Sequence, residues 1–432
     1  MTEKRNITIQ VPVLARVEGE GALDLTIRDG AIDDLQLRIY EPPRLFEQFV
    51  CGHSPDSVLD MVARICGICP VAYQMTAVQA LEQAFNIKVS DWVEQMRRVF
   101  YCGEWLQSHA LHIHLLAAPD FLGFNNVAEM ATRYADEVRR GLRLQTLGND
   151  LIALFGGRSV HPVVVCVGGF YHAATAKAVS AMRERLLAAR DEGSELIQWT
   201  ASLPLPDQTQ AFVSVALQEP DRFAMNHGRI VSSNGLDIDV TEYEQHFREF
   251  QAPHSTALHA LLHDQPFLVG PLARLNLNQH ALPATLQDQL GQTGIRFPSQ
   301  NMFHSIVARA AEIWLIINEA IDLLEHYQRP DATHSEWQPR AGTGIAATEA
   351  PRGLLWHRYD TNADSTVTRA RIVPPTSQNQ AQIEADLRQS LQSFGLDQDD
   401  QALRLRGEMV IRNYDPCISC ATHFLRLNVT RD

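Results

Sequence analysis

The first 40 residues alternate between hydrophobic and polar positions as half-buried strands do. Residues 7–16 alternate loosely, and residues 22–28 and 32–40 form two further strand-like runs. Asp29-Gly30 separates those two runs, and an Asp-Gly pair between alternating segments is a strong hairpin signal. We therefore expect a β-hairpin region at the N-terminus.

After this region the hydrophobic positions recur every three or four residues, which predicts helices. Trp92, Met96 and Val99 illustrate this spacing near the start of one such segment. The same pattern predicts four long helices, at residues 91–117, 127–155, 173–203 and 301–327.

Two β regions accompany the helices. Residues 209–239 are typical of short strands and loops, residues 344–373 are typical of a strand meander, and the helical pattern returns near Gln378. Regular strand–helix alternation is missing, which argues against a Rossmann sheet. We predict a mainly α (α+β) fold: a core bundle of long helices, an N-terminal β-hairpin region and a small β meander near the C-terminus.

No internal repeat, low-complexity tract or long Gly/Ser linker divides the sequence. This favours one compact domain over residues 1–432. Its expected parts are a β-rich part (1–54), a mainly helical part (55–340), the β meander (341–376), a C-terminal helical part (377–423) and a tail (424–432).

The composition is globular, with 45% hydrophobic and 20% charged residues among 432, and the net charge is −14. An acidic chain argues against binding to nucleic acid or anionic membranes, which attract basic surfaces. The most apolar helical stretch, residues 310–324, contains Glu312, Glu319 and Asp322, and a membrane span needs roughly 20 mostly apolar residues. We expect a cytoplasmic chain, or one exported with a partner that carries the signal.

Four of the seven cysteines form two C-x-x-C pairs, Cys66 with Cys69 and Cys417 with Cys420. Each pair can present two sulfurs from one tight turn, so four thiolates could converge on zinc, nickel, copper or an iron–sulfur cluster. A structural zinc site is the ordinary interpretation, although zinc ribbons usually connect nearby segments of domains with little core. A thioredoxin-type redox pair would need a βαβ context, which is missing.

Several short motifs accompany the cysteine pairs: RVEGEG at 16–21, RICGICP at 64–70, GRSVHP at 157–162, GGF at 168–170, VGPLAR at 269–274, APRG at 350–353, PTSQN at 375–379 and DPCISCATH at 415–423. In this order they are specific. Over nearly its whole length the chain resembles the large (alpha) subunit of NiFe-hydrogenases.

This resemblance implies a nickel ion held by four thiolates. Cys66 and Cys417 would be terminal nickel ligands, and Cys69 and Cys420 would bridge to an iron that carries carbon monoxide and cyanide. Heterolytic cleavage of dihydrogen needs a Lewis-acidic metal and a nearby base. The resemblance implies that Cys417 is this base and that Glu18 relays the proton.

The resemblance also assigns residues around the metals. Arg352 would lie over them, where its forked donors suit a cyanide or a bound substrate. Asp120 and Asp415 would orient this arginine, and Thr376 would hydrogen-bond the other cyanide.

A second metal is implied, a structural magnesium ion. Its ligands would be Glu47, His423 and a backbone carbonyl near Ile372, a set that suits a hard cation. In this family a maturation endopeptidase clips the precursor after the C-terminal histidine once chaperones have inserted nickel. The tail after His423, residues 424–432, would therefore be removed.

Two positions differ from many members of the family and indicate a branch of it. Many relatives have histidine where this chain has Glu20 and Tyr73. In both positions the chain resembles the cytosolic sulfhydrogenase or bidirectional branch, which couples hydrogen to NAD(P). Residues 342–347 match G-x-G-x-x-A only superficially, because no clear strand precedes them and no helix follows. We therefore expect no nucleotide in this chain. The remaining cysteines offer no further ligand set, so we also expect no iron–sulfur cluster in it.

Electrons would leave through an iron–sulfur small subunit, followed by flavin- and NAD(P)-binding diaphorase subunits. The expected function is reversible cleavage of dihydrogen by the catalytic large subunit of a NiFe-hydrogenase. Three alternatives remain open: a hydrogen sensor with the same metals, a relative of the quinone-site subunit of respiratory complex I, which has lost the cysteines, and a structural zinc protein.

Overall fold

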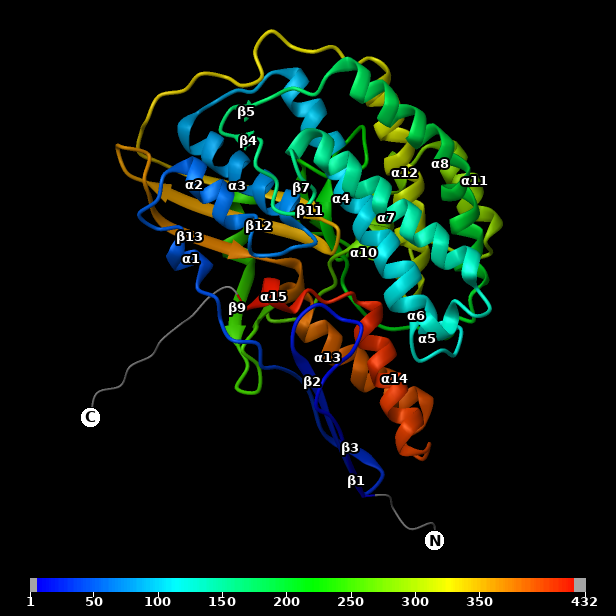
Figure 1. Cartoon of the computed structure of the whole chain (residues 1–432). Coiled ribbons are helices and arrows are strands. Elements are labelled where there is room, and N and C mark those ends of the chain that lie inside the picture. Colours follow the sequence, from blue (N-terminus) through cyan, green and yellow to red (C-terminus); the bar gives the residue numbers. More distant parts are fainter. Residues whose placement is uncertain (1–5, 423–432) are drawn as a thin grey trace, which may run out of the picture.

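Long helices form the body of the molecule in the computed structural model, which describes residues 6–422. The longest are α4 (Asp91–Leu111), α7 (Ala135–Gly156), α8 (Ala176–Ser202) and α12 (Ser305–Glu325). α4 packs against α7 and α12, and α12 packs against α8 (Figure 1). The predicted mainly α (α+β) fold is confirmed.

Two of the predicted long helices are interrupted. α4 ends at Leu111 and continues as a π-helical turn, His112–Ala117, before α5 (Ala118–Phe121). Pro119 has no N–H to donate to the preceding turn, which explains why the regular hydrogen-bond ladder changes there. The predicted helix over 127–155 is α6 (Val127–Met130) followed by a turn and α7.

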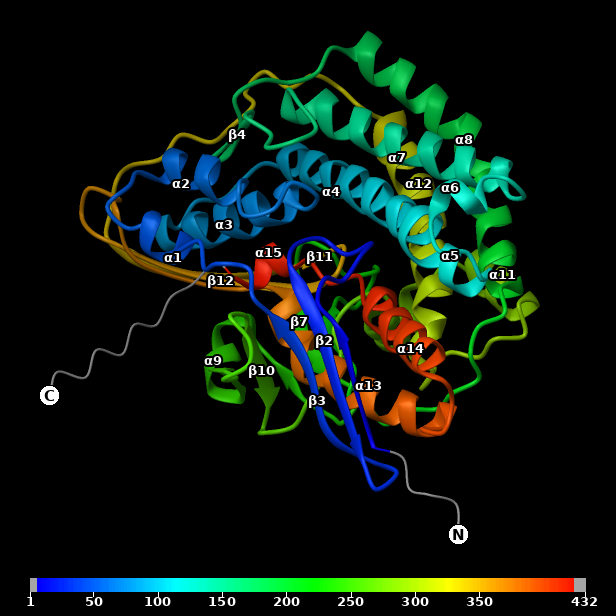
Figure 2. The ribbon, with the colours of Figure 1, turned by 60° about the horizontal axis from the view of Figure 1, so that its bottom comes forward.

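The predicted N-terminal hairpin is present as part of a three-stranded antiparallel sheet. Its strands are β1 (Ile7–Val11), β2 (Gly21–Arg28) and β3 (Ala31–Ile39), in that order. Asp29 and Gly30 both have positive φ, 52° and 77°, as the turn of a two-residue hairpin requires. This sheet extends away from the helical body (Figure 2).

The predicted meander consists of β11 (Gly342–Ala350), β12 (Gly353–Thr361) and β13 (Val367–Val373). Helix α3 (Pro70–Phe85) lies on this sheet. A Cβ atom on Gly344 would lie 1.7 Å from the backbone oxygen of Ala80 in α3, so only glycine permits this approach. The glycines that superficially suggest a nucleotide motif therefore serve packing of α3 on the sheet.

Small sheets and short helices make up much of the remaining chain. The strands are β4 (Val165–Cys166), β5 (Gly169–Phe170), β6 (Val215–Gln218), β7 (Arg229–Ser232), β8 (Asp237–Ile238), β9 (Phe247–Gln251) and β10 (Leu258–Leu262). The short helices are α1 (Phe46–Phe49), α2 (Pro55–Val62), α9 (Tyr243–His246), α10 (Pro271–Leu277) and α11 (Ala284–Gln292).

Three helices complete the chain: α13 (Pro375–Phe394), α14 (Asp400–Asn413) and α15 (Ile418–Ala421). α13 contacts α14, α15, β3 and β10, so it joins the N-terminal sheet to the C-terminal cysteines. α13 begins slightly before the predicted limit of the meander, because Pro375 suits the first turn of a helix. Within residues 6–422, every helix is too short or too polar to span a bilayer.

Candidate metal centre

The two C-x-x-C turns meet although they belong to opposite ends of the chain. Cys69 immediately precedes α3, Cys417 immediately precedes α15, and Cys420 lies in that short helix. In both figures α15 lies inside the molecule, beside the meander and α13. The side chains of all four cysteines are buried.

The four sulfur atoms form one cluster, with all of them within 4.8 Å of one another. Cys66 Sγ lies 3.3 Å from Cys417 Sγ, Cys69 Sγ lies 3.7 Å from Cys420 Sγ, and Cys417 Sγ lies 2.6 Å from Cys420 Sγ. Four thiolates around one ion, at metal–sulfur bonds of about 2.3 Å, lie roughly 3.8 Å apart. The donor set and the two longer distances therefore fit a thiophilic metal, whereas Cys417 and Cys420 lie closer together than two ligands of one ion.

The pKa values of the four thiols are shifted in different directions. Burial raises the pKa of Cys69, Cys417 and Cys420. Burial also acts on Cys66, but hydrogen bonds from the other three thiols and the charge of Arg352 lower its pKa well below the usual value. Two backbone N–H groups of the same turn also donate to Cys66 Sγ, each over 3.3 Å. Cys66 is thus the thiol whose anion this environment favours most.

Glu18 lies directly beside the cluster. Cys417 Sγ donates to Glu18 Oε2 over 3.1 Å, and the Ser419 backbone N–H donates to the same oxygen over 3.0 Å. The Ile418 N–H donates to the Glu18 carbonyl, which fixes the two segments together. Burial raises the pKa of Glu18, and the negative charge of Cys66 adds to the rise. This carboxylate is therefore in position to exchange a proton with Cys417.

The neighbouring Gly19 explains how Glu18 comes so close. It has φ of 91°, and a Cβ atom there would lie 2.6 Å from the Cβ of Ile418. Any larger residue would push the strand end away from the C-terminal cysteine turn, so glycine permits the contact.

Arg352 and Asp415 form a buried pair next to the sulfurs. Arg352 Nε donates to the Asp415 carbonyl over 2.7 Å, and Nη2 donates to Oδ1 over 3.0 Å. Arg352 Nη1 is buried without a partner among residues 6–422. Burial alone would lower the pKa of Arg352, but Asp415 and the thiols of Cys417 and Cys69 raise it well above its usual value. The site therefore has a permanent positive charge with one free donor.

The structure contradicts the predicted pairing of Asp120 with Arg352. Asp120 Oδ2 instead accepts from Arg412 Nε over 2.7 Å, and Arg16 forms a second, very short ion pair with Oδ1. Asp120 lies in α5, directly after the π-helical turn, and faces Arg412 of α14. It orients Arg412, which lies one turn before Asp415, rather than the arginine at the metals.

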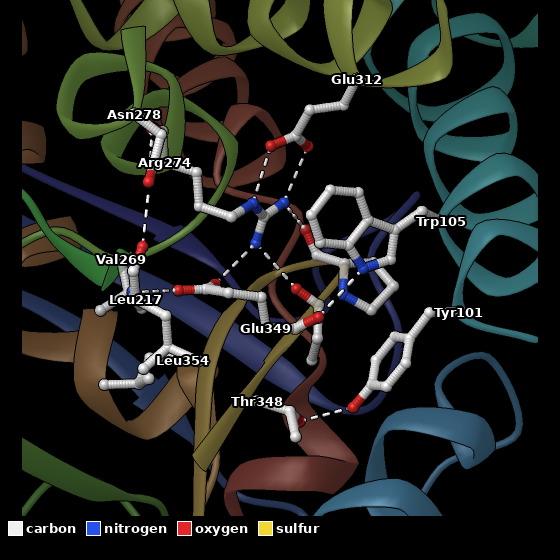
Figure 3. A network of polar contacts seen from close by, with 12 residues as sticks. Tyr101, Trp105, Leu217, Val269, Arg274, Asn278, Glu312, Thr348, Glu349 and Leu354 are labelled. Atoms are coloured by element: carbon white, nitrogen blue, oxygen red, sulfur yellow. Dashed lines mark hydrogen bonds and ion pairs between the residues drawn. The ribbon is translucent and has the colours of Figure 1, made fainter. Parts of the chain in front are cut away.

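A buried network around Arg274, which the sequence did not predict, is shown in Figure 3. Arg274 donates to both oxygens of Glu312, at 2.7 and 2.8 Å, and to Glu349 at 3.0 Å. It also donates to the carbonyls of Ala350 and Pro351, at 2.8 and 2.9 Å, directly before Arg352.

Charge and aromatic contacts complete this network. The Arg274 guanidinium lies 4.2 Å from the ring centroid of Trp105. Burial raises the pKa of Glu349 to about 7, whereas Arg274 lowers that of Glu312 to about 2 despite its burial. Burial lowers the pKa of His109, which faces Glu312, to about 4.

Arg274 belongs to the VGPLAR motif, but its partners lie on α12 and β11, which are distant from it in the sequence.

Two more polar groups support the cysteine turns. The Thr376 hydroxyl accepts from the Cys417 N–H over 3.0 Å. Glu104, in the middle of α4, accepts from the N–H groups of Val71 and Ala72 over 2.6 and 3.0 Å, which caps the start of α3. Glu104 was missed by sequence reasoning, and its signal was a charged residue at a buried helical position.

Two of the three predicted magnesium ligands lie together. The Ile372 N–H donates to Glu47 Oε1 over 2.7 Å, which brings the end of β13 beside α1. The third predicted ligand, His423, lies outside the described residues, as does the tail over 424–432.

The chain also matches a known protein family. The family model of the nickel-dependent hydrogenases matches residues 44–143 and 243–423. The chain is 30% identical to the alpha chain of sulfhydrogenase 1 of Pyrococcus furiosus, over 98% of this chain and 99% of that protein. It is 27% identical to a chain of the F420-non-reducing hydrogenase of Methanothermobacter marburgensis, over 96% of this chain and 95% of that one.

Solved structures show the same fold. The crystal structure of an NAD+-reducing [NiFe]-hydrogenase in the H2-reduced state superposes with a TM-score of 0.87 at 25% identity, over 98% of this chain and 100% of that chain. A [NiFeSe]-hydrogenase from Dm. baculatum superposes with a TM-score of 0.80 at 23% identity, over 97% and 100% of the two chains. The chain therefore belongs to the nickel-dependent hydrogenases, oxidoreductases in which it is the large subunit.

Proposed function

We propose that the four cysteines hold a nickel–iron pair. Cys66 and Cys417 would be the terminal nickel ligands, and Cys69 and Cys420 would be shared with an iron that carries carbon monoxide and cyanide. The observation that carries this proposal is the convergence of four buried sulfurs within 4.8 Å from two distant turns. Thiolates prefer such soft or borderline metals.

When bound, the metal pair supplies a Lewis-acidic, redox-active centre for the cleavage of dihydrogen to two protons and two electrons. The protein moves the protons. Cys417 Sγ takes a proton and passes it to Glu18 Oε2 over the 3.1 Å contact. The Ser419 N–H on the same oxygen stabilises the carboxylate and keeps it aimed at the sulfur.

Arg352 and Thr376 would hold the small ligands of the iron. Arg352 Nη1 is a buried donor without a partner among the described residues, and it suits one cyanide or a bound substrate. The Thr376 oxygen already accepts from Cys417, so its own proton is available for the other cyanide.

A structural magnesium ion would bind Glu47, the Ile372 carbonyl and His423. Support comes from the 2.7 Å hydrogen bond that brings Glu47 to Ile372. Removal of residues 424–432 by a maturation endopeptidase, after chaperones have inserted nickel, would free the C-terminal end at His423. The single domain over 1–432 that we propose would then end at this residue.

The electrons leave through other chains. We propose an iron–sulfur small subunit together with flavin- and NAD(P)-binding diaphorase subunits in a cytoplasmic complex. Similarity to the alpha chain of a sulfhydrogenase and to an NAD+-reducing [NiFe]-hydrogenase supports the NAD(P) linkage.

The test uses the complex purified with its natural partners. We expect one nickel per large subunit, no zinc in its place, and dihydrogen-dependent reduction of NAD+ or NADP+. Cys69→Ser should lose nickel and activity, while Cys51→Ser, at a half-buried free cysteine outside the sulfur cluster, should keep both. Zinc in place of nickel, or equal effects of the two variants, would contradict the proposal. Reduction of an artificial dye alone would contradict only the NAD(P) linkage.

A further inference from the structure

A second group of metal-binding side chains lies outside the cysteine cluster. It consists of His254, in the turn between β9 and β10, His259, in β10, and Glu384, near the middle of α13. The three segments come together because β10 pairs with β9 and packs against α13. Glu384 lies eight residues after Thr376 on the same helix, roughly 12 Å along its axis.

The ligand atoms of these three residues converge. One atom from each residue lies within 4.8 Å of the other two. His254 Nε2 lies 2.8 Å from Glu384 Oε1, and His259 Nε2 lies 3.8 Å from Glu384 Oε2. Ligands of a tetrahedral zinc ion, with bonds of about 2.0–2.1 Å, lie roughly 3.3 Å apart, and the two observed distances bracket this value.

His259 provides an independent observation. Its side chain is only about 1% exposed, and neither ring nitrogen has a hydrogen-bond partner among residues 6–422. A buried imidazole normally satisfies at least one nitrogen, because an unmet polar group costs about 1–3 kcal/mol. Its Nε2 faces Glu384 at a distance too long for a hydrogen bond, so a bound cation would satisfy it.

Both the carboxylate and the turn are held in place by β3. The Leu37 N–H donates to Glu384 Oε1 over 3.0 Å, which orients the carboxylate. Thr256 follows His254 closely, and its N–H donates to the Ile39 carbonyl over 2.8 Å. Its hydroxyl also donates to the Glu41 carbonyl over 2.8 Å. Such supporting contacts orient ligands before a metal arrives.

We propose that His254, His259 and Glu384 bind a divalent zinc-class cation, with water as the fourth ligand. Two imidazoles and one carboxylate are a ligand set typical of zinc. The ion would connect the β9–β10 hairpin to α13, the helix whose first turn carries Thr376 against Cys417. Zinc binding here requires neither the cysteines nor the nickel–iron pair.

The test is zinc binding to the full complex with its cysteine site loaded. We expect one zinc ion per large subunit, nitrogen and oxygen ligands without sulfur in X-ray absorption, and an anomalous peak between the three side chains in crystals. Zinc should also raise the melting temperature. Sulfur ligation, or no zinc bound at all, would overturn the proposal whatever the cysteine site contains.

Variants make the assignment specific. His254→Ala, at a half-buried turn position, and Glu384→Gln should each weaken zinc binding at least tenfold, since even supporting residues of metal sites cost about 10–100-fold. Both should abolish the zinc-dependent rise in melting temperature. His259→Gln should do the same, and His172→Ala, at an exposed position, is the matched control. Equal zinc affinity in all four variants would overturn the proposal.

Discussion

At the scale of single residues, the function of the cysteine site depends on which polar atoms beside it can still bind a proton or a ligand. Glu18 accepts two hydrogen bonds on one oxygen and lies 3.1 Å from Cys417 Sγ. Arg352 uses two of its nitrogens on Asp415 and keeps the third free among the described residues. One group can thus move a proton, and the other can hold a ligand.

Replacing Glu18 tests the proton path. Glu18→Gln keeps the shape and the Ser419 contact but cannot take up a proton at neutral pH. We expect activity with dihydrogen to fall at least about 100-fold, with nickel content unchanged, because positioned acid–base groups contribute about 10²–10⁴-fold. Glu20→Gln, at an exposed position two residues later, is the control. Near-normal turnover of Glu18→Gln would show that protons leave by another route.

Replacing Arg352 tests the free donor. Arg352→Lys keeps the charge but loses the planar fork that bonds Asp415 and leaves Nη1 available. We expect at least a tenfold loss of activity with nickel retained, measured as turnover per nickel. Full activity of the lysine variant would mean that charge alone matters here.

At the scale of elements, the cysteine turns depend on neighbouring helices. Glu104 of α4 caps α3, and Arg274 of α10 ties α12 and β11 to the carbonyls before Arg352. Glu104 thus fixes the start of α3, directly after Cys69, and Arg274 fixes the segment that precedes Arg352.

Glu312→Gln tests this support. It leaves the buried Arg274 with less compensating charge, and breaking a buried pair typically costs about 3–5 kcal/mol. We expect a clear fall in melting temperature and reduced activity. Glu325→Gln, at the exposed end of the same helix, breaks only its surface pair with Arg183, and should cost about 1 kcal/mol or less. Equal melting temperatures for the two variants would contradict the role of the network.

Asp386 of α13 makes stability depend on pH. Burial raises its pKa to about 6, although Tyr414 and Gln382 donate to it. The folded chain therefore binds this proton more tightly than the unfolded chain, whose pKa is about 3.9. The contribution to stability is present below pH 4 and is lost as pH rises through 6.

Asp386→Asn removes this dependence. We expect the melting temperature of the original chain, relative to the variant, to fall as pH rises from 4 to 7. The change corresponds to at most about 3 kcal/mol, at roughly 1.4 kcal/mol per pKa unit. A difference that stays constant over this range would refute the assignment of the raised pKa to Asp386.

At the scale of the whole molecule, local patterns predicted the helices, the hairpin and the meander, because hydrophobic period and turn residues are local signals. Glu18 and the four cysteines, which belong to separate motifs, lie together in the structure. The pairing of Asp120 was wrong, because a motif identifies a carboxylate but not which of several arginines it meets.

Other features had no local signal. The Arg274 network and the His254, His259 and Glu384 group draw on segments distant in the chain, which only tertiary packing brings together. The break between α6 and α7 also escaped prediction, since the hydrophobic period continues across it.

The central claim is that the four cysteines hold a nickel–iron pair whose iron carries carbon monoxide and cyanide. An infrared spectrum of the complex, purified without oxygen, tests it most directly, because these ligands absorb where proteins do not. We predict bands of both ligands that shift when dihydrogen is added. A fully matured, nickel-loaded preparation without these bands would contradict the claim and leave the cysteines to another metal.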